Sequence, residues 1–223
     1  MTTAMQSDFI FNLTFAVLIA MSALTWTIAI GKVIQLRQAR RRALAISQTL
    51  ASQTDWLDFQ ALGHNSKAGD AGFLMQHICE ICDEYAGVGH SSYTFEQLHA
   101  MFAAEVQRKL GVIARHKESW LNALASISST APFLGLFGTV WGIMQALVVI
   151  GETGAANITV VAAPIGGALT TTAVGIVTAI PAVVFFNIVN RMVRQHIGEL
   201  ENFSEGLLRY VLHYRSRWGE GLA

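Results

Sequence analysis

The chain has 223 residues, of which 52% are hydrophobic and only 13% are charged, and its 15 basic residues balance its 15 acidic ones. Since soluble domains carry roughly 25% charged residues, this composition excludes an ordinary water-soluble globular protein. The net charge of zero gives no information on partners, because the basic residues are unevenly distributed along the chain.

The first predicted element is a membrane-spanning helix over residues 9–31, a charge-free stretch that follows a short N-terminal segment, 1–8. A helix of about 20 apolar residues crosses the ~30 Å hydrocarbon layer of a bilayer. A cleaved signal peptide would carry its basic residues before the apolar stretch. Here Arg37 and the run Arg40, Arg41 and Arg42 follow it, which favours a retained anchor.

Residues 32–118 are predicted to form a helical domain outside the membrane. Apolar residues at mixed three- and four-residue spacing continue the first helix to Leu62, where a glycine-rich run, 63–72, breaks it. A short helix follows, and Thr94 with Gln97 forms a candidate capping box for a helix leading to the next span. The apolar faces of these two helices comprise Leu74, Ile78, Ile81, Cys82 and Tyr85, and then Phe95, Leu98, Phe102, Val106, Leu110 and Ile113.

The longest apolar part of the chain runs from Ser119 to Asn190, where Glu152 is the sole formal charge. Its length predicts two further membrane-spanning helices, at 119–150 and 158–190, joined by a short hairpin at 151–157. The sequence therefore predicts an all-α integral membrane protein with three transmembrane helices that extend into a cytoplasmic helical domain.

Small residues in the second and third spans predict close helix packing. Where side chains are small, two helix backbones can approach each other inside a membrane, and lipid gains little from such a surface. The three prolines of the chain, at 132, 164 and 181, lie in or beside these spans, where each removes a backbone donor. The candidate packing residues are Gly135, Gly138 and Gly142 in the second span, and Ala163, Gly167, Thr171, Gly175 and Ala179 in the third.

Ten hydroxyl side chains add a polar component to the same two spans. A single serine or threonine in a helix commonly bonds back to a carbonyl one turn earlier, but ten in two spans are harder to explain in that way. They are Ser126, Ser128, Ser129, Thr130 and Thr139, followed by Thr159, Thr170, Thr171, Thr172 and Thr178.

The last segment, 191–223, is predicted to be a cytoplasmic helix. Apolar residues recur along it at alternating spacings of four and three, which is typical of a heptad seam. Two interpretations stay open: the seam packs on the same helix of sister subunits, or it lies on the cytoplasmic domain of its own chain. The seam comprises Val193, Ile197, Leu200, Ser204, Leu207, Val211, Tyr214 and Trp218.

The basic residues predict the orientation. All 15 fall in two blocks, from Lys32 to Lys117 and from Arg191 to Arg217. Since cytoplasmic loops are enriched in lysine and arginine, both blocks are expected to be cytoplasmic. The N-terminus is then expected outside the cytoplasm and the C-terminus inside it, in a multi-pass membrane protein.

Three stretches of the second and third spans resemble the ExbB/TolQ/MotA proton-channel family, and they are closer to ExbB than to TolQ. The first is Thr130-Ala-Pro-Phe-Leu-Gly-Leu-Phe-Gly-Thr-Val-Trp-Gly-Ile-Met144. The others are Ala163-Pro-Ile-Gly-Gly-Ala-Leu-Thr-Thr-Thr-Ala-Val-Gly-Ile176 and Ala179-Ile-Pro-Ala-Val183. The resemblance covers about residues 119–187.

The resemblance implies a ring of identical subunits, with a pentamer expected, around the membrane helices of an ExbD/TolR-like one-span partner. Proton flow through the ring would drive a TonB-like protein that powers outer-membrane transport. It also implies that Thr139 and Thr172 line the proton pathway, because both match the two family threonines. The family's intramembrane glutamate is Gly167 in this chain, so the proton carrier is expected to come from the partner.

Other candidate sites are weaker. Cys79 and Cys82, with His77 nearby, have metal-ligand spacing, but packing on a helix face explains the cysteines better, and no metal site is expected. The arginine run beside the first span is better explained by topology and anionic lipid than by nucleic acid. The chain contains no enzyme motif and no motif for a cofactor.

Two further functions stay open besides the ExbB-like motor subunit. One is a TolQ-like subunit for envelope maintenance. The other is a non-conducting membrane scaffold or stator, which would include an inactive subunit of the family. A polar strip on the inward face of the ring would favour the motor, and an all-apolar face would favour the scaffold.

Overall fold

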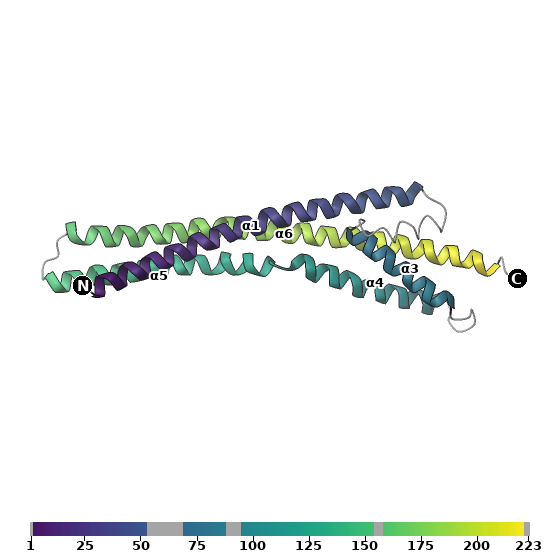
Figure 1. The fold of residues 1–223 in the computed structure, drawn as a ribbon, viewed down its shortest axis with the longest axis horizontal. Coiled ribbons are helices and arrows are strands. Elements are labelled where there is room, and N and C mark those ends of the chain that lie inside the picture. The colour runs from purple at the N-terminus through teal and green to yellow at the C-terminus, as the bar shows by residue number, and fades with distance from the viewer. Residues whose placement is uncertain (1, 53–68, 88–94, 154–157, 221–223) are drawn as a thin grey trace. The chain divides into compact units, whose positions relative to one another are not determined.

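The computed structural model describes residues 2–52, 69–87, 95–153 and 158–220, and this part of the chain is helical apart from a turn at residues 119 and 120 (Figure 1). The sequence predicts a break at 63–72, of which residues 63–68 lie outside the described residues, as do the loop after Gly87 and the capping residue Thr94. Residues 69–72 are helical, so the predicted break is wrong there. The helices are α1 (Thr2–Ser52), α3 (Gly69–Gly87), α4 (Phe95–Glu118), α5 (Leu121–Thr153) and α6 (Ile158–Glu220).

Three parts of the described chain are long and apolar enough to cross a membrane: Phe9–Ile46, His99–Glu152 and Val161–Arg209. Only 22%, 28% and 28% of the residues in their most apolar windows are buried inside the chain. The remaining apolar side chains face outward, and a water-soluble protein could not tolerate so large an exposed apolar surface. The helices therefore require lipid or further protein around them, as the sequence predicts.

The chain divides into two compact units, which we describe separately. Unit 1 comprises Met1–Lys32 and Trp120–Asn190, and unit 2 comprises Val33–Ser119 and Arg191–Ala223. In unit 1, α1 packs through Leu18 against Ala131 of α5 and Ala179 of α6. Small alanines at this contact let the three helices approach one another closely.

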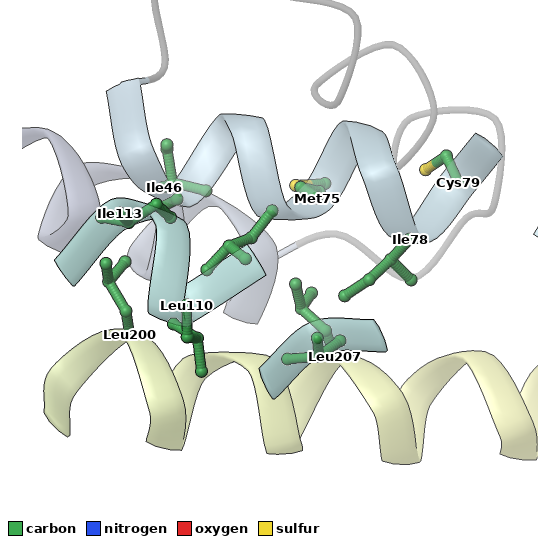
Figure 2. Packing of buried hydrophobic residues seen from close by; sticks show 11 residues of the cluster. Ile46, Met75, Ile78, Cys79, Leu110, Ile113, Leu200 and Leu207 are labelled. Carbon is green, nitrogen blue, oxygen red and sulfur yellow. The ribbon is translucent and has the colours of Figure 1, made fainter. Parts of the chain in front are cut away.

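Unit 2 has a conventional apolar core, to which four helices contribute (Figure 2). Ile46 of α1, Ile78 of α3, Leu110 of α4 and Leu200 of α6 all belong to it. The sequence-predicted apolar faces of α3 and α4 also supply Leu74, Val106 and Ile113 to this core. Phe102 is buried in a second, smaller cluster with Ile81 and Leu208. Burying a side chain of this size contributes about 1.5–3 kcal/mol.

The structure decides between the two interpretations of the C-terminal seam. Leu200 and Leu207 of α6 are fully buried in the core of unit 2, with Ile197 packed against it, and Val193 and Ser204 are buried as well. The seam therefore packs on its own chain, and the prediction that it packs on sister helices is wrong for these positions. The side chains of Val211, Tyr214 and Trp218 lie outside the described residues.

Between α4 and α5 the helix breaks at Ser119 and Trp120. Trp120 has φ of 73°, in the left-handed region that residues with a Cβ rarely adopt. The hydroxyl of Ser119 donates to the carbonyl of His116 at 2.7 Å, and the carbonyl of Trp120 accepts from the backbone N–H of Ala123 at 3.1 Å. These bonds close one helix and open the next, so α4 ends and α5 begins at the strained conformation of Trp120.

Trp120 provides a test of this break. We expect Trp120→Gly to be more stable than Trp120→Ala by about 1 kcal/mol, because only glycine adopts a positive φ without a steric cost. The alanine variant is the matched control, since both substitutions remove the same exposed indole ring. Thermal unfolding in detergent measures the difference, and equal unfolding temperatures would contradict the strained conformation.

Candidate functional site

The second and third spans meet along a seam of small residues, which we call the glycine seam. It comprises Gly135, Gly138 and Gly142 on α5 and Ala168, Thr171 and Gly175 on α6. A Cβ built on Gly142 would lie 2.5 Å from the Cβ of Ala168, and one built on Gly138 would lie 2.8 Å from the Cβ of Thr171. Real Cβ atoms do not approach so closely, so these positions require glycine.

At its centre the glycine seam brings backbone against backbone. A Cβ on Gly175 would lie 2.8 Å from the carbonyl oxygen of Ala131 and 3.0 Å from the Cα of Gly135. A Cβ on Gly135 would lie 3.0 Å from the Cα of Thr172. Because backbone atoms cannot rotate away as side chains can, the two helices have no room for any side chain here.

Thr139 and Thr172, the two threonines singled out from the sequence, meet beside this seam. The hydroxyl of Thr172 donates to the carbonyl oxygen of Gly135 at 3.0 Å, and it lies 3.4 Å from the hydroxyl oxygen of Thr139. Thr139 in turn donates to the carbonyl of Leu136 at 2.7 Å. Two hydroxyls from two helices are thus held together, each with a lone pair left to accept a hydrogen bond.

Most other hydroxyls in these spans have a local role. Thr170 donates to the carbonyl of Gly166 at 2.9 Å, and Thr171 donates to that of Gly167 at 3.1 Å. Ser128, Ser129 and Thr130 likewise bond to carbonyls of their own helix. Thr172 differs from them because its hydroxyl bonds to another helix.

The remaining small residues of α6 have separate surroundings. Gly167 faces α1, and a Cβ there would lie 3.4 Å from the ring of Phe11. Ala179 is 8% exposed and packs with Leu18. Ala163 is exposed, because strict fourth-residue spacing drifts around a helix of 3.6 residues per turn. Ala168, which the sequence pattern did not indicate, lies in the glycine seam where Ala163 was expected.

Unit 2 holds a buried polar cluster that the sequence did not indicate. Asp70 of α3 accepts hydrogen bonds from Lys117 of α4 and His196 of α6, both at 2.8 Å. Lys117 is 6% exposed and His196 is 2% exposed. Burial acts to raise the pKa of Asp70, but the two hydrogen bonds and the charges of these partners outweigh it and hold that pKa below its usual value.

This Asp70 cluster was missed because no spacing rule connects three residues on three different helices. Asp70 falls in the glycine-rich run that the sequence predicts to be a break, whereas α3 begins at Gly69 and places Asp70 in its first turn. An acidic residue is favoured there by the helix dipole. That local preference is the only signal the sequence offers for it.

Cys79 of α3 is fully buried in the apolar core of unit 2, where it packs with Met75 and Ile78 (Figure 2). This location is what the packing interpretation predicts for it. The nearby His77 points to a different partner, because its Nε2 lies 2.8 Å from a carboxylate oxygen of Glu105. The side chain of Cys82 lies outside the described residues.

Comparison with known proteins identifies the family. A model described as the MotA/TolQ/ExbB proton channel family matches residues 83–202, which include α5 and the threonine pair. The chain belongs to this family. The match extends from α3 into the part of α6 that belongs to unit 2 and therefore covers more than the apolar stretches that carry the sequence resemblance.

Several relatives in the family are named biopolymer transport protein ExbB. The protein of Neisseria gonorrhoeae is 36% identical over 180 residues, which cover 79% of this chain and 80% of the relative. The Pseudomonas putida protein is 32% identical over 206 residues, covering 92% of this chain and 61% of the relative. The Salmonella typhimurium protein is 32% identical over 207 residues, covering 91% and 82%.

Proposed function

We propose that this chain is an ExbB-like subunit of a proton-driven complex in the bacterial inner membrane, which energises a TonB-type protein for outer-membrane transport. The observation that carries the proposal is the interhelical pair Thr139 and Thr172, held beside the glycine seam in a member of a proton channel family. Relatives named ExbB favour this function over a TolQ-like role in envelope maintenance.

The proton carrier is proposed to come from a second protein. Residues 9–31 contain no titratable side chain, and between Ser119 and Asn190 only Glu152 is acidic. Glu152 is exposed near the end of α5, away from the threonine pair. Because moving a proton through hydrocarbon requires a group that changes its protonation state there, we assign that role to an aspartate on an ExbD/TolR-like helix.

The threonine pair is suited to assist such an aspartate. A hydroxyl that donates to a backbone carbonyl can still accept a hydrogen bond from water or from a protonated carboxyl group. The pair therefore offers polarity without a charge of its own. A non-conducting scaffold would need no hydroxyl pair between its helices, so the interhelical bond of Thr172 favours the conducting role.

Assembly and orientation follow from the outward surfaces and the charges. Large apolar side chains such as Phe133, Val140 and Leu169 are exposed on α5 and α6, and we propose that lipid and sister subunits of a homopentamer cover them.

The location of all lysines and arginines in two blocks supports a periplasmic N-terminus and a cytoplasmic C-terminus. The proposed role is mechanical and conductive, without catalysis.

Thr172→Val tests the function, because valine keeps the shape of threonine and removes the hydroxyl. We expect proton uptake into vesicles that contain this chain and its partner to fall about tenfold, the equivalent of one lost hydrogen bond. Thr139→Val should act in the same direction. Thr170→Val is the matched control, since the hydroxyl of Thr170 bonds only to its own helix. Proton uptake with this variant should equal that of the unmodified protein.

Two results would contradict this mechanism. One is substantial proton uptake by vesicles that contain this chain alone, because it would place the carrier within the chain. The other is undiminished uptake in both Thr172→Val and Thr139→Val, provided that native mass spectrometry shows an intact oligomer.

A further inference from the structure

A small cavity lies between α1 and α6 within unit 2. Its volume is about 140 Å³, several times the ~30 Å³ share of one water molecule, so it admits a polyatomic group. Its lining combines an apolar side with basic and amide side chains. The lining residues are Leu36, Arg37, Arg40, Met192, Gln195 and His196.

The buried ring of His196 forms part of the cavity wall. The side chain is 2% exposed, and its Nε2 is held 2.8 Å from Asp70. Its other ring nitrogen, Nδ1, is buried and has no hydrogen-bond partner among the residues that the structure describes. Leaving such an atom unsatisfied is costly. Because Nδ1 has almost no accessible surface, a ligand in the cavity reaches it only if the surrounding side chains move, so the site is argued from the other polar groups of the lining.

The charges around the cavity favour an anion. Asp70 is offset by Lys117, and Glu199 is offset by Arg40 at 2.7 Å. Arg37 adds a positive charge at the cavity wall. Guanidinium groups match the oxygens of phosphate with two parallel hydrogen bonds.

We propose that this cavity binds a phosphate group, supplied by the headgroup of an anionic phospholipid or by free phosphate. Arg37 and Arg40 donate to its oxygens from α1, and the side-chain amide of Gln195 donates from α6. The cavity residues of α1 come shortly after the charge-free segment 9–31 in the sequence, and those of α6 come shortly after the charge-free segment 158–190. That position is where lipid headgroups meet a spanning helix, so the lipid source is expected to dominate.

The test uses the full-length protein in neutral detergent, with lipid binding followed by native mass spectrometry. We expect phosphatidylglycerol to bind at least about tenfold more tightly than zwitterionic phosphatidylcholine. Arg37→Gln and Arg40→Gln should each remove most of that preference, since each deletes a charged hydrogen-bond donor. Arg41→Gln is the matched control, because Arg41 is exposed on the same helix and does not line the cavity.

A second arm separates the two sources of phosphate. Stabilisation of lipid-free protein by inorganic phosphate over chloride at equal ionic strength, lost in Arg37→Gln and retained in Arg41→Gln, would support the site with free phosphate as its ligand. Equal losses in all three variants would show diffuse attraction to the arginine run and overturn the proposal. Absence of any preference for phosphatidylglycerol or phosphate would overturn it as well, without affecting the proposed proton path.

Discussion

Gly175→Ala is expected to destabilise the protein by about 1–3 kcal/mol, although it adds only one methyl group. The new Cβ would lie 2.8 Å from the carbonyl oxygen of Ala131 and 3.0 Å from the Cα of Gly135. Relief requires α5 and α6 to separate along the glycine seam, which would also disturb the hydrogen bond from Thr172 to Gly135. Thermal unfolding in detergent measures the loss.

The matched control for this prediction is Gly166→Ala in the same helix. A Cβ on Gly166 meets nothing within 4 Å, so this variant should gain up to about 1 kcal/mol from the better helix propensity of alanine. The two variants are thus expected to shift the unfolding temperature in opposite directions. If Gly175→Ala unfolded at or above the temperature of Gly166→Ala, the close contact of the two helices would be wrong.

Asp70→Ala is expected to be the most damaging single change in unit 2, at about 3–5 kcal/mol. It removes the carboxylate that accepts from Lys117 and from His196, both of which stay buried. Glu205→Ala, which removes an exposed carboxylate from α6, is the control and should change stability little. Chemical or thermal unfolding at neutral pH compares them, and equal effects would refute the importance of the cluster.

The Asp70 cluster also predicts how stability depends on pH. The folded protein holds the pKa of Asp70 below its usual value, so ionised Asp70 favours the folded state. This contribution is complete above about pH 4, the ordinary pKa of an aspartate, and is lost as the pH falls through the lower folded-state value. Asp70→Asn should therefore show a weaker loss of stability in acid than the unmodified protein, as followed by unfolding temperature.

Properties that depend on one helix at a time could be predicted from the sequence. Residues at the spacing of a helix face, such as Ile78 and Phe102, are buried as expected, because periodicity fixes which side of a helix is apolar. The sequence pattern does not show which surface an apolar helix face packs against. The C-terminal seam has the heptad spacing of an intersubunit contact, yet Leu200 and Leu207 pack within the chain, since any apolar surface of matching shape satisfies the same pattern.

For the candidate site, residue types were predictable and their contacts were not. The two threonines were found through resemblance, but the bond from Thr172 to Gly135 depends on how α5 and α6 are rotated about their axes. Asp70, Lys117 and His196 come together from three helices. Spacing along the sequence cannot predict contacts among residues of three different helices.

The glycine seam also excludes water from the contact between α5 and α6. With the backbone of Gly135 directly against that of Gly175, no file of water molecules can pass between the two helices. On the proposed function, a subunit without its partner would therefore pass no protons between these two helices. Proton current would then require the carrier to dock beside them, and assembly of the complex would control when the current flows.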